Sequence, residues 1–123
     1  MDRAQLADWI AAYERAWRTA GTDALQELFA PGARYRMGPY EPTAEGLDAI
    51  AELWEREREG PDEAFEMRAE VVAVEGDTGV AQVEVRYGAS GNEFRDLWLV
   101  RLDGDGRCVE FEEWAFSPGQ KVG

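Results

Sequence analysis

Two acidic residues on neighbouring predicted strands could carry out acid–base chemistry. Asp96 lies in the run FRDLWLVRL, Glu113 lies in the run CVEFEEWAF, and the turn residues Asp-Gly-Asp-Gly at 103–106 lie between the runs. Because these residue types favour a tight turn, the two runs are predicted to pair as an antiparallel hairpin. A four-residue turn would place Asp96 opposite Glu113 and Trp98 opposite Phe111, all on one face. Directly opposed like charges repel each other. Such a pair is therefore either hydrated at the rim of the aromatic patch or serves a function.

Two interpretations of this carboxylate pair remain open. In the first, Trp98 and Phe111 desolvate the carboxyl groups and mutual repulsion raises one pKa, so that a shared proton provides an acid and a base near neutral pH. In the second, the pair is hydrated at the mouth of a cavity and is bonded to Tyr35, Tyr87 or backbone N–H groups. A one-residue bulge near the turn would place the two acids on opposite faces.

The elements that must position this pair follow from the spacing of apolar residues. Helices are predicted over residues 3–20, 23–29 and 43–59. Strands are predicted over residues 33–37, 65–74, 80–88, 94–102 and 108–116. The alternating charges of residues 55–59 are interpreted as a solvent-exposed helix face. This order predicts an α+β fold in which a curved antiparallel or mixed β-sheet wraps around three N-terminal helices.

A sheet curved in this way is predicted to enclose a cavity lined by inward-facing side chains. The candidate ligand contacts are Tyr13, Trp17, Tyr35, Met37, Trp54, Tyr87, Trp98 and Phe111, and Asp96 and Glu113 are the candidate catalytic pair. Tyr35, Tyr87 and Trp98 are the stronger candidates, because each joins an apolar ring to a polar tip. Trp17 and Trp54 lie at helical spacing and fit a packed core equally well.

Composition narrows the function classes. The 123 residues include 13 basic and 26 acidic side chains, for a net charge of −13, which argues against nucleic acid or an anionic membrane as partner. There is no histidine, and the glycines form no phosphate-binding or dinucleotide-binding pattern, so no metal or cofactor is expected. The single cysteine, Cys108, excludes an internal disulfide. Without a signal-peptide pattern or an apolar run of spanning length, the protein is expected to be cytoplasmic.

The other face of the hairpin predicts self-association. Leu97 and Leu99 share that face with Trp114 and Phe116. An exposed apolar sheet face usually marks an interface. We therefore expect a homodimer formed through these four residues.

Three stretches of the sequence resemble one known superfamily. They are the passage WRTAGTDALQELFAPGA at 17–33, the Gly-Leu-Asp-Ala-Ile run at 46–50, and the hairpin residues 106–114. Together with the element order, they resemble the nuclear transport factor 2-like superfamily, in particular its SnoaL-like and ketosteroid isomerase-like members. The resemblance covers nearly the whole chain. It implies a single domain over residues 1–123, a cone-shaped α+β roll, and a pocket for a small apolar ligand.

The catalytic residues of known members carry over only in part. Met37 resembles the position of the general-base aspartate of ketosteroid isomerases, and methionine cannot take a proton. Trp98 resembles their protonated aspartate, and an indole N–H can still donate a hydrogen bond. Glu113 resembles the last-strand carboxylate of limonene epoxide hydrolase-like members, and Tyr35 resembles their water-positioning tyrosine.

Two function classes therefore remain open from the sequence. The first is a cofactor-free acid/base enzyme of the isomerase, cyclase or hydrolase class that acts on a small apolar metabolite. The second is a non-catalytic ligand-binding or dimerisation module with the same fold.

Overall fold

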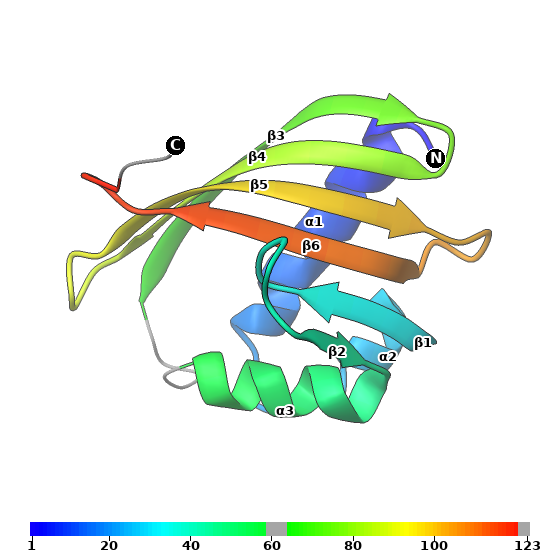
Figure 1. The fold of residues 1–123 in the computed structure, drawn as a ribbon, viewed down its shortest axis with the longest axis horizontal. Coiled ribbons are helices and arrows are strands. Elements are labelled where there is room, and N and C mark those ends of the chain that lie inside the picture. The colour runs from blue at the N-terminus through cyan, green and yellow to red at the C-terminus, as the bar shows by residue number, and fades with distance from the viewer. Residues whose placement is uncertain (59–63, 121–123) are drawn as a thin grey trace.

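A computed structural model of the chain describes residues 1–58 and 64–120. Within these residues it shows one six-stranded curved sheet with three helices (Figure 1). The helices are α1 (Arg3–Trp17), α2 (Leu25–Leu28) and α3 (Leu47–Glu57). The strands are β1 (Phe29–Arg36), β2 (Thr43–Glu45), β3 (Phe65–Glu75), β4 (Thr78–Tyr87), β5 (Glu93–Leu102) and β6 (Cys108–Phe116). The predicted α+β class is confirmed.

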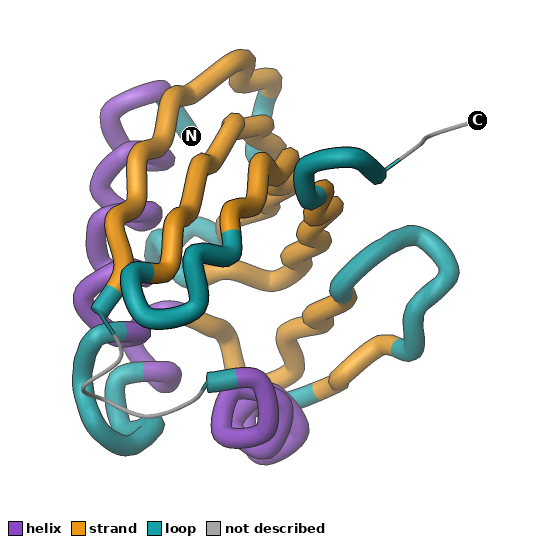
Figure 2. Tube along the Cα trace, turned by 90° about the vertical axis from the view of Figure 1, so that its left-hand side faces the viewer, coloured by secondary structure: helices purple, strands orange, loops and turns teal. Residues whose placement is uncertain are grey.

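The sheet is mixed, with the order β2-β1-β6-β5-β4-β3. β6 lies parallel to β1 and antiparallel to β5, and the remaining neighbours are antiparallel. Figures 1 and 2 show α1 running across one face of the sheet, while α3 lies beside β1 and β2. In this arrangement, one of the two alternating sets of side chains on the long strands points toward the helices.

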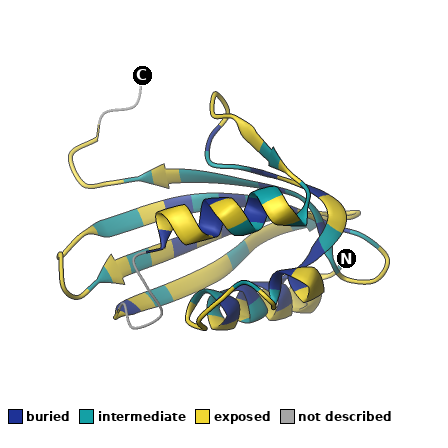
Figure 3. Cartoon of the chain, turned by 90° about the horizontal axis from the view of Figure 1, so that it is seen from below, coloured by how far each residue is buried: buried dark blue, intermediate teal, exposed yellow. Residues whose placement is uncertain are grey.

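Helix α1 begins and ends where its sequence dictates. The Asp2 side chain accepts a hydrogen bond from the backbone N–H of Gln5, and the Gln5 side chain accepts one from the backbone N–H of Asp2, which forms a capping box. The inward stripe is Leu6, Trp9, Ile10, Tyr13 and Ala16. Figure 3 shows buried and exposed residues alternating along the helices, as expected when one side of each packs on the sheet.

The helix predicted over residues 43–59 begins later than expected. Thr43–Glu45 instead form strand β2, which pairs with β1, and α3 begins after Gly46. Gly46 has φ of +90°, a conformation that glycine adopts readily and that interrupts a helix. Residue 59, the predicted end of this helix, lies outside the described residues.

The β5–β6 hairpin has a different register from the predicted one. Asp96 pairs with Ala115, and Glu113 pairs with Trp98. The predicted direct opposition of the two acids is therefore wrong. Asp96 and Glu113 are instead diagonal neighbours, and both lie on the face that points toward the helices.

Two one-residue shifts in the pairing of β5 with β6 explain why Asp96 and Glu113 still share the predicted face. The loop 103–107 is one residue longer than predicted, so that Leu102 pairs with Cys108. The register then shifts again at Val109. A single offset would turn the following side chains to the other face, and two offsets restore the original face.

The core lies between the sheet and the helices and is rich in aromatic rings. Its most fully buried large side chains are Trp54, Trp98, Tyr35, Phe29 and Phe111. The indole N–H of Trp9 donates to the backbone oxygen of Leu28 at 2.9 Å and ties α1 to α2. Among the described residues, no helix is long and apolar enough to cross a membrane.

Candidate active site

A cavity of about 320 Å³ opens between the helices and the sheet. Of the residues predicted from the sequence, it is lined by Tyr13, Trp17, Tyr35, Met37, Tyr87, Asp96, Trp98 and Glu113. Trp54 and Phe111 are not among its described lining residues. Both are only 1% exposed and pack behind Tyr13, with ring centroids 4.9 and 5.6 Å from that ring. They support the cavity wall.

Asp96 is a buried carboxyl group with an unused acceptor atom. The residue is 7% exposed, and its Oδ1 atom has no hydrogen-bond partner among the described residues. Burial raises the pKa of Asp96 to about 6, although hydrogen bonding with Trp98 and Glu113 partly offsets this effect. Its pKa therefore lies close to the pH at which a general base works best.

Glu113 holds its proton more tightly than Asp96 does. Burial, the negative charge of Asp96, a hydrogen bond with Asp96 and the charge of Glu57 together raise the pKa of Glu113 to about 8, against the lowering effect of hydrogen bonding with Trp98. The two carboxyl groups therefore titrate as a pair. Near neutral pH, Asp96 is mostly ionised and Glu113 is mostly protonated.

The cavity floor also carries hydrogen-bond donors. The hydroxyl oxygens of Tyr13 and Tyr35 lie 2.7 Å apart and share a buried hydrogen bond. Burial raises the pKa of both hydroxyl groups well above the usual value, so both remain protonated at physiological pH. The indole N–H of Trp98 is buried without a hydrogen bond of normal geometry to any described residue. A ligand oxygen could satisfy this donor.

Several lining residues were missed in the sequence. They are Leu53, Glu57, Phe65, Ser90, Asn92, Phe94 and Ala115. Met67 and Val85 line the cavity at inward positions expected from alternation along their strands. Glu57 was assigned to an exposed, charged helix face, and it is exposed, but it also borders the cavity. Its spacing from Ile50 and Leu53, three or four positions per step, would have placed it on the inward side of α3.

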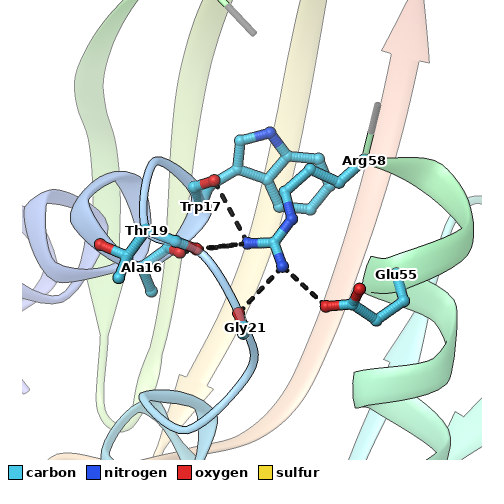
Figure 4. A network of polar contacts seen from close by, with 6 residues as sticks. All are labelled: Ala16, Trp17, Thr19, Gly21, Glu55 and Arg58. Carbon is cyan, nitrogen blue, oxygen red and sulfur yellow. Dashed lines mark hydrogen bonds and ion pairs between the residues drawn. The ribbon is translucent and has the colours of Figure 1, made fainter. Parts of the chain in front are cut away.

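Arg58, unlike its neighbours 55–57, departs from the expected exposed face. The residue is 9% exposed, and its guanidinium donates to the backbone oxygens of Thr19 at 2.8 Å and Gly21 at 2.9 Å (Figure 4). It also forms an ion pair of 2.8 Å with Glu55 and contacts the carbonyls of Ala16 and Trp17 at 3.4 and 3.3 Å. Arg58 thus joins the end of α3 to the unsatisfied carbonyls that follow α1.

No group of three or more cysteine, histidine or acidic side chains is arranged to hold a metal ion within residues 1–58 and 64–120. The chemistry that the described lining offers is therefore that of two coupled carboxyl groups, two tyrosine hydroxyls and an indole N–H.

The fold agrees with the comparisons between this chain and known proteins. A model of the SnoaL-like domain family matches residues 10–111. The chain belongs to the SnoaL-like family. The resemblance proposed from the sequence is thereby confirmed. Asp96 and most of the cavity lining fall within the matched region, whereas Glu113 and Ala115 lie beyond its end.

Solved structures similar to this SnoaL-like chain include three at about one-quarter sequence identity. A nuclear transport factor 2-like protein of unknown function from Mesorhizobium loti is 25% identical, with a TM-score of 0.69 over 94% of this chain and 95% of its own. A candidate polyketide cyclase from Sinorhizobium meliloti is 25% identical, with a TM-score of 0.65 over 86% and 93%. A ketosteroid isomerase-like protein from Erwinia carotovora atroseptica is 26% identical, with a TM-score of 0.61 over 94% and 96%. No curated protein matches the chain.

Proposed function

We propose that the protein is a cofactor-free acid/base enzyme that acts on a small, mostly apolar metabolite bound in the cavity. The observation that carries the proposal is the pair Asp96 and Glu113, whose raised pKa values give one ionised and one protonated carboxyl group on the same cavity face. Groups with matched, perturbed pKa values in a cavity are typical of acid/base sites. The relatives named as a polyketide cyclase and as ketosteroid isomerase-like support this class of chemistry.

The two carboxyl groups would have complementary roles. The Asp96 carboxylate would take a proton from a carbon next to a ligand carbonyl, and Glu113 would give its proton to the carbonyl oxygen, which yields an enol. The electron pair of the broken C–H bond forms the new C=C bond, so that no oxidant or cofactor is needed. The Trp98 N–H and the tyrosine hydroxyls would hold the oxygen as negative charge develops on it.

The wall of the cavity would exclude water from this reaction. Tyr13, Tyr35 and Trp98 are each 5% exposed or less. Met37 and Trp17 are partly buried and complete the apolar part of the lining. Proton transfer in such a site depends on the enzyme carboxyls and not on bulk solvent.

Deuterium incorporation tests the proposal without knowledge of the natural substrate. Two-ring ketones such as 2-tetralone carry exchangeable protons next to the carbonyl, and mass spectrometry can follow their exchange in D₂O. We expect the wild-type protein to accelerate exchange, and Asp96→Asn and Glu113→Gln each to reduce it by about a hundredfold or more. Glu52→Gln, which removes the charge of an exposed glutamate on α3 outside the described cavity lining, is the matched control.

The variants also separate catalysis from binding. If Asp96→Asn and Glu113→Gln bind the ketone as wild type does but lose exchange, the carboxyl pair acts in chemistry. If the ketone binds and exchange is equal in all variants and in buffer, the enzyme proposal is wrong and the cavity serves binding alone.

We also propose that the protein is a homodimer through the outer face of the sheet. Leu97 and Leu99 on β5, together with Trp114 and Phe116 on β6, are half-buried in the monomer. Four such side chains on adjacent strands form an apolar surface that a second copy could cover.

A further inference from the structure

We propose that the ligand of this cavity is an apolar molecule that carries a protonated amino group, and that Glu57 at the end of α3 pairs with that group. The inference concerns the same cavity as the proposed function and names the charge class of its ligand. It goes beyond the acid/base roles of Asp96 and Glu113, because Glu57 takes no part in the proton transfer.

The first observation is the sign of the charges that face the cavity. The titratable side chains in its described lining are Tyr13 of α1, Tyr35 of β1, Glu57 of α3, Tyr87 of β4, Asp96 of β5 and Glu113 of β6. None of the described lining residues is lysine or arginine. An anionic ligand would therefore meet negative groups without a compensating cation, whereas a cation would be attracted.

The second observation is that two arginines that contact rings of the cavity lining, Arg18 at Phe65 and Arg58 at Trp17, are already engaged. The Arg18 guanidinium lies 3.8 Å from the centroid of the Phe65 ring, donates to the Phe65 backbone oxygen at 3.0 Å and pairs with Glu14 at 2.9 Å. Arg58 is bound to backbone carbonyls and to Glu55. Neither guanidinium is available to neutralise Glu57, for which the described residues form no ion pair.

The third observation is that this end of the molecule already stabilises a buried cation. The Arg58 guanidinium lies 5.9 and 6.0 Å from the ring centroids of Trp17 and Trp54, and backbone oxygens at the end of α1 accept its hydrogen bonds. Because helix C-termini are partially negative and aromatic faces attract cations, the ends of α1 and α3 favour positive charge. Trp17 and Glu57 belong to these ends and line the cavity.

The inner part of the cavity supports a ligand that is held at two ends. Asp96 Oδ1 is buried without a hydrogen-bond partner among the described residues, and Trp98 Nε1 is buried without a bond of normal geometry to them, so a polar ligand group could bond to both atoms. The apolar body of the ligand would lie against the rings of Trp17, Phe65 and Phe94. A molecule with a polar, reactive end at Asp96 and an ammonium group at Glu57 meets both requirements.

Binding of three matched probes tests the charge class. The probes are 2-(1-naphthyl)ethylamine, 2-(1-naphthyl)ethanol and the anion of 1-naphthaleneacetic acid. They share a two-ring body and are, respectively, positive, neutral and negative at neutral pH. Isothermal titration calorimetry at low ionic strength should show the amine binding about tenfold more tightly than the alcohol, and the acetate binding least. Amine binding that is no tighter than alcohol binding, including no amine binding at all, would overturn the proposal.

Variants of α3 separate a local contact from the general negative charge of the protein. We expect Glu57→Gln to reduce the preference for amine over alcohol about threefold, since Glu57 is exposed to solvent, and Glu57→Lys to reverse the preference. The matched control Glu52→Gln removes the same charge from the solvent side of α3 and should leave the preference unchanged. Equal effects of Glu57→Gln and Glu52→Gln would contradict the assigned pairing.

The result is independent of the test for proton transfer. Deuterium exchange without a preference for the amine would leave the acid/base function in place and remove the inferred ligand class. A preference for the amine without deuterium exchange would support the inferred ligand class and remove the acid/base function. The two proposals therefore fail in different experiments.

Discussion

At neutral pH, Glu113 stays protonated, whereas an exposed glutamate would be ionised. Burial, followed by the charge of Asp96, raises its pKa from 4.5 to about 8. Between these values the folded protein binds more protons than the unfolded chain, so the free energy of unfolding must fall as the pH rises through this window. The carboxyl pair is thus held in place at a cost in stability at alkaline pH, as is common for functional residues.

Glu113→Gln should remove most of this pH dependence. A glutamine keeps the shape and hydrogen-bonding capacity of the protonated acid but cannot ionise. We expect wild type and variant to be similarly stable near pH 5, and the variant to be more stable by a few kcal/mol near pH 9. Urea denaturation at the two pH values measures the difference. If Glu113→Gln and the surface variant Glu52→Gln lose stability equally between these pH values, Glu113 does not hold a proton in the folded protein.

The sequence placed the two acids on one face but not in their true register. Alternation along the strands was enough to assign Asp96 and Glu113 to the inner side of the sheet. The direct pairing was wrong because the conformation of the loop 103–107 and the shift at Val109 depend on packing around the buried Cys108 and Leu102, and turn propensity does not encode that packing. A pattern of period two cannot detect two compensating offsets.

At the scale of elements, the long strands were predictable and the three-residue strand β2 was not. The predicted strands at 94–102 and 108–116 agree with β5 and β6 to within one residue. Strand β2 was hidden inside a predicted helix, because Thr43–Glu45 are extended only through their pairing with β1. Tertiary pairing of this kind is not visible in local spacing.

Arg58 connects two helices, and its removal should loosen that connection. Arg58→Met would leave the backbone oxygens of Thr19 and Gly21 without their donors and should destabilise the protein by about 3 kcal/mol. Arg58→Lys keeps the charge but cannot reach both oxygens with a planar fork, so we expect an intermediate loss. Thermal or urea unfolding measures both.

The partner of Arg58 provides the control for this prediction. The Glu55 side chain is 59% exposed, so Glu55→Gln should cost less than about 1 kcal/mol. An equal loss of stability in Glu55→Gln and Arg58→Met would show that the ion pair, and not the bonds to the carbonyls, holds the two helices together.

At the scale of the whole molecule, the two faces of the sheet have separate roles. The inner face carries the cavity. The outer face carries four apolar side chains, Leu97, Leu99, Trp114 and Phe116, and a polar network beside them. In that network, Arg36 and the indole N–H of Trp114 both donate to the carboxylate of Glu112. The two donors lower the pKa of Glu112 against the opposing effect of burial. This carboxylate therefore stays ionised and fixes the orientation of Trp114.

A preorganised aromatic side chain on an apolar face favours association with a second copy. If the homodimer forms through this face, Leu99→Glu should convert it to a monomer, because the new charge would be buried at the centre of β5. Sedimentation velocity over a range of concentrations measures the change. Val72→Glu introduces the same charge on the edge strand β3, two strands away, at a side chain that is 48% exposed, and should leave the dimer intact. A wild-type chain that sediments as a monomer at every concentration would exclude this interface.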